Sequence, residues 1–278
     1  MLRLRDARTG KLTDVLPAGR RQLRILVYAP GPFGSGPVRA YLTADLLRRA
    51  AEISQMLPLV SDFLPAEADV TALREACDAL NIHPPRDTFL GPVSAVSGIL
   101  SGMPPFDVGV AAVSSRGATP GPPPVSPRGA TPGPPPAAPG EIAGSARLWA
   151  QVPGDAGMVD TSAEPATVRL RLLQWGYCEP IADGGPGGEG FQDGDAAETL
   201  SRWRSLVAHW ARSPSGAMSR PHADAIAGAF AVDLETPAAL RILAALADDA
   251  GVPDGVKFET FAAADRLLGL DLARDVGK

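Results

Sequence analysis

A proline-rich segment divides this chain into two parts. Residues 114–140 contain ten prolines among 27 residues, and the nonapeptide RGATPGPPP occurs twice, at Arg116–Pro124 and Arg128–Pro136. Proline lacks the backbone N–H that helices and sheets need, so the composition predicts an extended, solvated and disordered insertion. A linker is favoured over a docking site for a proline-recognising partner, because two short repeats are weak evidence for one. The fold must therefore form from the residues on either side.

Strands and helices alternate before the insertion. Residues 23–29, 56–60 and 107–113 are short aliphatic runs typical of buried strands. Apolar residues recur at helical spacing over residues 38–53 and 70–80. This order predicts a Rossmann-like α/β domain with a parallel sheet.

After the insertion, one more strand is expected at residues 146–152, and helical patterns then dominate. The expected helices cover residues 165–177, 196–210, 223–232, 237–250 and 258–268. These helices predict an α-helical bundle. The expected domains are 1–113 (first part of the Rossmann-like domain), 114–140 (insertion), 141–162 (last part of that domain) and 163–278 (helical bundle).

Composition excludes several classes of protein. The 278 residues carry a net charge of −5 and include no basic tract of the kind that binds nucleic acid. The two cysteines, Cys77 and Cys178, have no paired spacing, so neither a disulfide framework nor a zinc knuckle is expected, and both are expected to pack in the core. The amino terminus has no apolar signal segment, and no apolar run is long enough for a membrane span. A cytoplasmic location without membrane contact is expected.

One loop has the shape of a phosphate site. The stretch YAPGPFGSGPVRAYLTADLLRR, residues 28–49, passes from a strand through a glycine-rich turn into a helix. Gly34, Ser35 and Gly36 would present backbone N–H groups at the start of the helix, with Arg39 shortly after them. A plain strand-to-helix turn would use the same residues, and that alternative stays open.

Several stretches together resemble the cysteinyl-tRNA synthetase family of class I aminoacyl-tRNA synthetases, which includes the cysteine ligase of mycothiol synthesis. They are LRLRDARTGKLTDVLP with the loop above, DALNIHPPRD, PATVRLRLLQWGY and AFAVDLETPAALRILAALA. They follow one another in the family's order. The resemblance implies a Rossmann-like domain of the class I synthetase type, ATP as a ligand and an adenylation reaction.

The chain departs from that family at its catalytic motifs. Tyr28 stands where the family has a zinc-binding Cys, and residues 35–38, Ser-Gly-Pro-Val, stand where it has H-I-G-H. The family's K-M-S-K-S loop would fall near GMVDTS, residues 157–162, where its lysines are absent. Thr161 and Ser162 of this stretch join Gly34, Ser35, Gly36 and Arg39 as the candidate cofactor-binding residues. Glu141, without Cys and His partners, does not make a four-ligand site, so zinc is not expected.

These losses predict a catalytically impaired paralogue, a pseudoenzyme with no catalytic residue assigned. Removing one donor that stabilises transition-state charge typically costs about 2.7–4 kcal/mol, and several are missing here. The expected function is at most the binding of a nucleotide or an aminoacyl-adenylate. An active ATP-dependent ligase for cysteine or another carboxylate, of the tRNA or mycothiol type, is the first alternative. An interaction protein that binds an unknown partner through residues 114–140 is the second; tRNA is not expected as a partner.

Overall fold

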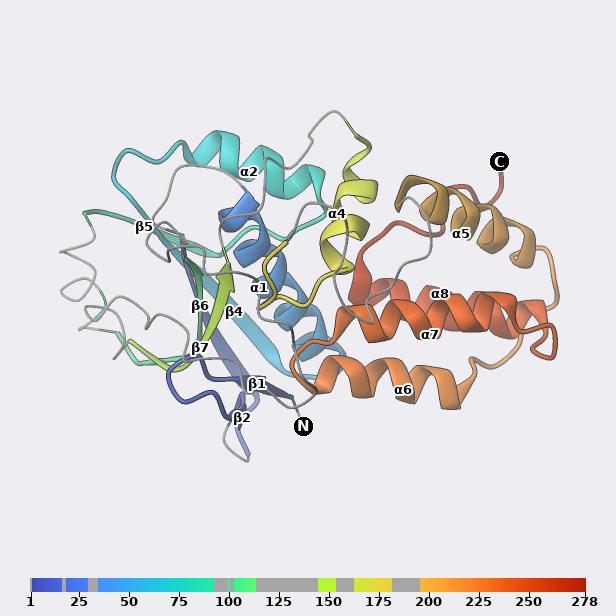
Figure 1. The fold of residues 1–278 in the computed structure, drawn as a ribbon, viewed down its shortest axis with the longest axis horizontal. Helices are drawn as coiled ribbons and strands as arrows, with labels where there is room; N and C mark the ends of the chain where they lie inside the picture. Colours follow the sequence, from blue (N-terminus) through green and yellow to red (C-terminus); the bar gives the residue numbers. More distant parts are fainter. Residues whose placement is uncertain are drawn as a thin grey trace, which may run out of the picture.

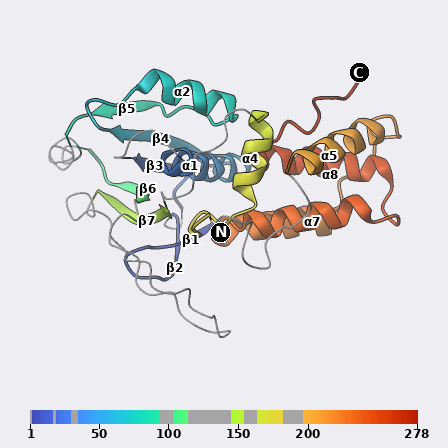
Figure 2. The same ribbon diagram turned by 45° about the horizontal axis from the view of Figure 1, so that its top comes forward.

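A five-stranded parallel sheet forms the centre of the first part of the chain (Figures 1 and 2). The computed structural model describes residues 2–16, 19–29, 35–92, 100, 103–113, 145–153, 163–181 and 196–278. The strand order is β5-β4-β3-β6-β7. The strands are β3 (Gln22–Tyr28), β4 (Leu57–Leu64), β5 (Asp87–Leu90), β6 (Phe106–Val113) and β7 (Ala146–Pro153). This order confirms the predicted parallel α/β sheet and agrees with a Rossmann-like domain.

Two helices, α1 (Ser35–Ile53) and α2 (Val70–Ala79), connect β3, β4 and β5 along one face of the sheet. On this face Ile25 and Val27 of β3 join the main core together with the apolar residues of α1. Side chains alternate along a strand, so Leu26 and Tyr28 point to the opposite face. There they join a second buried cluster that includes Phe63, Phe106 and Trp149. The sheet therefore has apolar packing on both faces.

The amino-terminal hairpin covers one edge of the sheet. It consists of β1 (Arg3–Arg5) and β2 (Leu12–Asp14), which pair antiparallel. Just after β1, the Ala7 amide donates to the Trp149 carbonyl of β7 over 2.8 Å, and Asp6 Oδ1 accepts from the Trp149 amide over 3.3 Å. These bonds occupy backbone groups of an edge strand that would otherwise be free to pair with another chain.

The later helices gather at the end of the molecule away from β5, with α4 (Pro165–Leu173) between them and the sheet (Figure 1). They are α5 (Ala196–Trp210), α6 (Arg220–Ala231), α7 (Thr236–Asp248) and α8 (Asp254–Leu268). Trp203 and Trp210 of α5 both pack edge-on against Phe261 of α8, with ring centroids 5.8 and 5.1 Å apart. Within the described ranges, no helix is long and apolar enough to cross a membrane.

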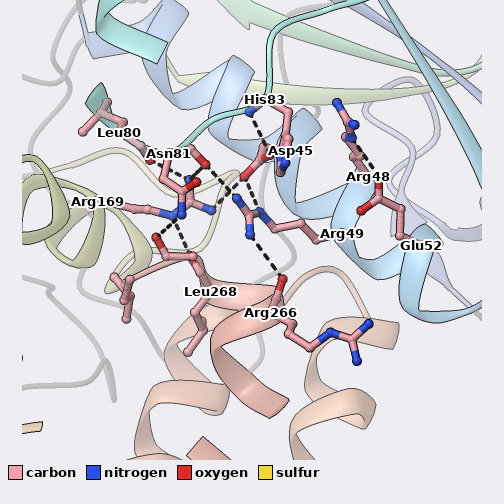
Figure 3. A network of polar contacts seen from close by, with 12 residues as sticks. Asp45, Arg48, Arg49, Glu52, Leu80, Asn81, His83, Arg169, Arg266 and Leu268 are labelled. Carbon is pink, nitrogen blue, oxygen red and sulfur yellow. Dashed lines mark hydrogen bonds and ion pairs between the residues drawn. The ribbon is translucent and has the colours of Figure 1, made fainter. Parts of the chain in front are cut away.

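A buried carboxylate fixes α1 to its surroundings (Figure 3). The Asp45 side chain is 0% exposed, and its Oδ2 accepts from Arg49 Nε at 2.7 Å and from Arg169 Nη2 at 2.8 Å. Its Oδ1 accepts from the His83 amide at 3.2 Å and lies 2.7 Å from His83 Nδ1. Burial alone would raise the pKa of Asp45, but the hydrogen bond from His83 and the charges of Arg169 and Arg49 hold it well below its usual range. Asp45 therefore stays ionised inside the protein.

Arg169 extends this network from α4 to two other segments. Its side chain is 0% exposed, and it donates to the carbonyls of Leu268, at the end of α8, and of Leu80 and Asn81, after α2, over 2.5, 2.9 and 3.1 Å. Gly269 ends α8 in the left-handed conformation, where a Cβ would lie 2.9 Å from Arg169 Nη2. One arginine thus joins α1, α4, α8 and the turn after α2.

Candidate functional site

The strand order places the candidate site at the carboxyl ends of β3 and β6. In open parallel sheets, ligands bind outside the carboxyl ends of the strands where the direction of winding reverses. Here that point lies between β3, which ends at Tyr28, and β6, which ends at Val113. Helix α1 begins at Ser35, shortly after β3, so its amino terminus lies at this edge and its backbone N–H groups face it.

The structure describes only some of the predicted site residues. Ser35 and Gly36 are the first two residues of α1, and Arg39 follows one helical turn later. Gly34, Thr161 and Ser162 lie outside the described residues. The first turns of α1 therefore bring Ser35, Gly36 and Arg39 together, while the cofactor-binding assignment of all six remains a prediction.

The Arg39 side chain is directed at backbone carbonyls. It is 3% exposed, and its Nη2 donates to the carbonyls of Gly176, Tyr177 and Glu179 over 2.9, 3.4 and 2.8 Å. Its Nη1 donates to the carbonyl of Pro153 at the end of β7 over 3.5 Å. Burial lowers the pKa of Arg39 to about 10 against the opposing effect of its acidic neighbours, so the group is still charged at neutral pH. Arg39 thus joins α1 to β7 and to the turn after α4.

Replacing Arg39 with methionine is expected to lower the free energy of unfolding by about 1–3 kcal/mol, because buried carbonyls would lose their donors. Urea denaturation at neutral pH measures the change. The matched control is Arg48→Met on the same helix, where the arginine pairs with Glu52 at the surface over 2.9 Å. The control should change stability by less than about 1 kcal/mol. Equal losses in the two variants would contradict the structural role of Arg39.

Aromatic side chains form a row on the face of the sheet opposite α1. Phe89, Phe63, Tyr28 and Ala111 are register partners on β5, β4, β3 and β6. Tyr28 and Phe63 are each 1% exposed, with ring centroids 6.2 Å apart, and Ala111 is 2% exposed. These walls were not predicted from the sequence, although the alternation of Leu26 and Tyr28 in β3 was a usable signal. The row borders the candidate site.

A polar cluster lies on the other face, beneath α1 and α2. Asp62 of β4 is 0% exposed, and its Oδ2 accepts from Tyr41 Oη at 2.5 Å and from Arg74 Nη2 at 3.0 Å. Burial and the neighbouring Asp62 charge raise the pKa of Tyr41 well above its usual range. Burial also raises the pKa of Cys77 to about 12, so this thiol is not ionised at neutral pH. Cys77 is 1% exposed and packs in the core, as predicted.

The raised pKa of Tyr41 has a consequence at high pH. An unfolded tyrosine ionises near pH 10, before the buried one does, so stability is full below about pH 10 and falls as the pH rises above it. The melting temperature should therefore drop between about pH 9 and 11. Tyr41→Phe removes this contribution, and its melting temperature should fall less over the same range. Parallel curves for the two proteins would contradict the assignment.

Two other histidines, His209 and His222, do not lie at the sheet edge but in the later helices. His209 Nε2 lies 3.7 Å from Asp254 Oδ2 and is 70% exposed, and His222 Nδ1 lies 2.7 Å from Ser219 Oγ. Cys178 is exposed, so the prediction that it packs in the core was wrong. Over the part of the chain that the structure describes, no three His, Cys, Asp or Glu side chains are grouped so that they could hold a metal ion.

A cleft of about 540 Å³ lies at the far end of α1, between the start of α4 and the end of α8. Several of its charged groups bond to other groups of the protein. Arg204 Nη1 donates to Glu164 Oε1 over 2.6 Å, and the Asp265 carboxylate accepts from the amides of Leu270 and Leu272 over 2.7 and 2.9 Å. Arg49, which also lines the cleft, is ten residues beyond Arg39, about 15 Å along the helix. These arginines therefore lie away from the start of α1.

Comparison with known proteins adds no assignment, because no protein-family model and no curated protein matches the chain.

Proposed function

We propose that this chain is a cysteinyl-tRNA synthetase-like protein of the class I type. It is a catalytically impaired paralogue that binds, at most, a nucleotide or an aminoacyl-adenylate at the carboxyl edge of its sheet. In this proposal α5 to α8 are the helical bundle that follows a Rossmann-like domain. The strand order supports the site, because the amino terminus of α1 faces the point where the winding reverses.

Contacts between the stretches that carry the resemblance also support the proposal. Asn81 of DALNIHPPRD accepts from Arg169 of PATVRLRLLQWGY over 3.1 Å. Tyr177, the last residue of that second stretch, donates to Asp233 of AFAVDLETPAALRILAALA over 2.7 Å. The same Asp233 oxygen accepts from the Arg5 amide in the opening segment, also over 2.7 Å. The four stretches thus hold one another in place, which suits a shared scaffold better than a chance series of short matches.

The observation that carries the catalytic part of the proposal is the position of the Arg39 guanidinium. Adenylation develops negative charge on the α-phosphate and on the leaving pyrophosphate, and it needs cations fixed around that charge. Arg39 is the arginine nearest in sequence to the glycine turn, and its donors are directed at the carbonyls of residues 153, 176, 177 and 179. A phosphate at this edge would rest mainly on the backbone N–H groups of α1, which suffices for weak binding but supplies little for catalysis.

Calorimetric titration of the full chain with ATP tests the binding part. We expect saturable binding with a dissociation constant between about 0.1 and 1 mM. Binding this weak is expected because the proposal assigns no side-chain cation to the phosphate. Arg39→Lys, which keeps the charge, should change this constant by less than about threefold, because the side chain does not contact the nucleotide. Absence of any saturable heat up to 10 mM ATP, on the order of ten times the weakest expected constant, would defeat the binding part of the proposal.

A further inference from the structure

A groove on the helical part of the chain is separate from the candidate site. It has a volume of about 680 Å³ and lies between α8 and residues 211–219, the segment that joins α5 to α6. We infer that this groove binds a short acidic segment of a partner protein. The inference goes beyond the proposed function and does not depend on it, because the residues that line the groove take no part in the candidate site.

The wall of the groove is fixed to α8 at two points. The Ser219 amide donates to the Thr260 hydroxyl of α8 over 2.9 Å. At the start of α8, Gly255 packs so closely against Pro214 that a Cβ on this glycine would clash with the Pro214 carbonyl oxygen. The segment between these two anchors is therefore held in place before any ligand binds, which lowers the entropic cost of binding.

Two arginines of the groove have free donors. Arg220 begins α6 and Arg266 lies in the last turn of α8, and both are exposed. Within the residues that the structure describes, neither guanidinium has a hydrogen-bond or ion-pair partner. Figure 3 shows the Arg266 side chain directed away from the network around Asp45, whereas Arg49 bonds to that carboxylate over 2.7 Å. The groove therefore presents two guanidinium groups, each of which can bind a carboxylate through two hydrogen bonds.

The acid of the groove is already bonded to the protein. Among the described residues that line the groove, Glu259 is the one carboxylate, and its Oε1 accepts from Ser215 Oγ over 3.0 Å. It lies two turns before Arg266 on the same face of α8, about 10 Å along the helix axis. The groove thus has an excess of positive charge, although the whole chain carries a net charge of −5. An acidic ligand is therefore attracted by this groove and not by the overall charge of the protein.

The shape of the groove suits a peptide. Ala262 and Ala263 lie between the charged residues on α8, and their small side chains let a backbone come close to the helix. Met218, which is 48% exposed, offers a flexible apolar contact at the opposite wall. A small molecule usually buries about 70–90% of its surface in its pocket, which an open groove along a helix does not provide. A peptide can lie along the groove with one side in solvent, its carboxylates on the arginines and an apolar side chain on Met218.

The test measures fluorescence polarisation of labelled peptides on the full chain at low ionic strength. The probes are a panel of nonapeptides, each with two glutamates at a different spacing around one leucine, and the same panel with glutamine in place of glutamate. We expect the tightest glutamate peptide to bind with a dissociation constant between about 10 and 100 μM, and its glutamine counterpart at least about tenfold more weakly. Absence of binding below about 1 mM for every glutamate peptide, or equal binding of the two panels, would overturn the inference.

Variants of exposed arginines locate the binding on the chain. Arg266→Gln and Arg220→Gln should each weaken the tightest peptide at least about fivefold, because each removes one charge-assisted contact. Arg212→Gln, the matched control, removes an exposed charge from the same connecting segment at a position that does not line the groove, and it should change the constant by less than about twofold. Equal weakening by Arg266→Gln and Arg212→Gln would overturn the inference, because it would show attraction without a site. A dimer in sedimentation that Arg266→Gln dissociates would also overturn it, because the groove would then hold a second copy of the chain.

Discussion

Replacing Asp45 with alanine is expected to lower the free energy of unfolding by about 3–5 kcal/mol, the usual cost of removing one partner from a buried ion pair. The variant would leave the guanidinium of Arg169, which is 0% exposed, and that of Arg49, which is 9% exposed, without their carboxylate (Figure 3). Urea denaturation at pH 7 measures the loss as a lower midpoint with an unchanged slope.

The control for Asp45→Ala lies on the same helix. Glu52 pairs with Arg48 over 2.9 Å, but its side chain is 45% exposed, so Glu52→Ala should cost less than about 1 kcal/mol. The double variant Asp45→Leu with Arg169→Met removes both charges of the Asp45–Arg169 pair. It should cost less than the sum of the two single changes, because neither member of that pair is left without the other, although Arg49 still loses its carboxylate. Similar losses for Asp45→Ala and Glu52→Ala would contradict the view that this network holds α1 in place.

Replacing Gly109 with alanine is expected to destabilise the protein by about 1–3 kcal/mol through overpacking. The added Cβ would lie 2.4 Å from two carbons of the Trp149 ring, which is 1% exposed and cannot move outward without disturbing the cluster around it. The measurement is again urea denaturation. The change in near-ultraviolet circular dichroism should report a displaced indole.

Gly228 is the matched control for Gly109. It lies inside helix α6, and a Cβ there would meet nothing within 4 Å. Gly228→Ala should therefore raise the free energy of unfolding by about 0.4–1 kcal/mol, since alanine restricts the unfolded chain and favours the helix. The two glycine substitutions should thus change the free energy of unfolding in opposite directions. Destabilisation by both would show that the contact with Trp149 is not what restricts residue 109.

The long aliphatic strands could be predicted from the sequence because they are buried on both faces. The predicted runs at residues 23–29, 107–113 and 146–152 match β3, β6 and β7 within a residue or two at each end. Strand β4 extends to Leu64, beyond the predicted end at residue 60. The extension carries the carboxylate side chain of Asp62 into the core, where Tyr41 and Arg74 donate to its Oδ2. Those partners are distant in sequence, so no local pattern could reveal them.

The short and polar elements could not be predicted in the same way. Strand β5 has four residues, two of them polar, and pairs with β4 alone. The hairpin strands β1 and β2 have three residues each and depend on their contacts with β7. Helix α8 begins at Asp254, four residues before the predicted start, and buries Lys257, whose Nζ donates to the Ala247 carbonyl over 3.1 Å. Tertiary contacts, rather than local sequence patterns, determine where all of these elements form.

The candidate site, too, could be predicted from the sequence only in part. A helix start after the glycine-rich turn followed from local glycine and proline chemistry; the prediction placed it at Val38, and α1 begins three residues earlier, at Ser35. The direction of the Arg39 side chain did not follow, because its carbonyl partners belong to residues 114 to 140 positions away in the chain. The burial of Tyr28 against Phe63 likewise depends on strand pairing that a single sequence does not reveal.

Exchange of pyrophosphate into ATP is the most direct measurement of the central claim, that this edge of the sheet has lost the charges which drive adenylation. The full chain is incubated with ATP, magnesium, labelled pyrophosphate and cysteine, and then with each of the other amino acids in turn. We expect exchange at the level of the protein-free background in every case. Exchange well above that background with any amino acid, lost on heat denaturation of the protein, would contradict it.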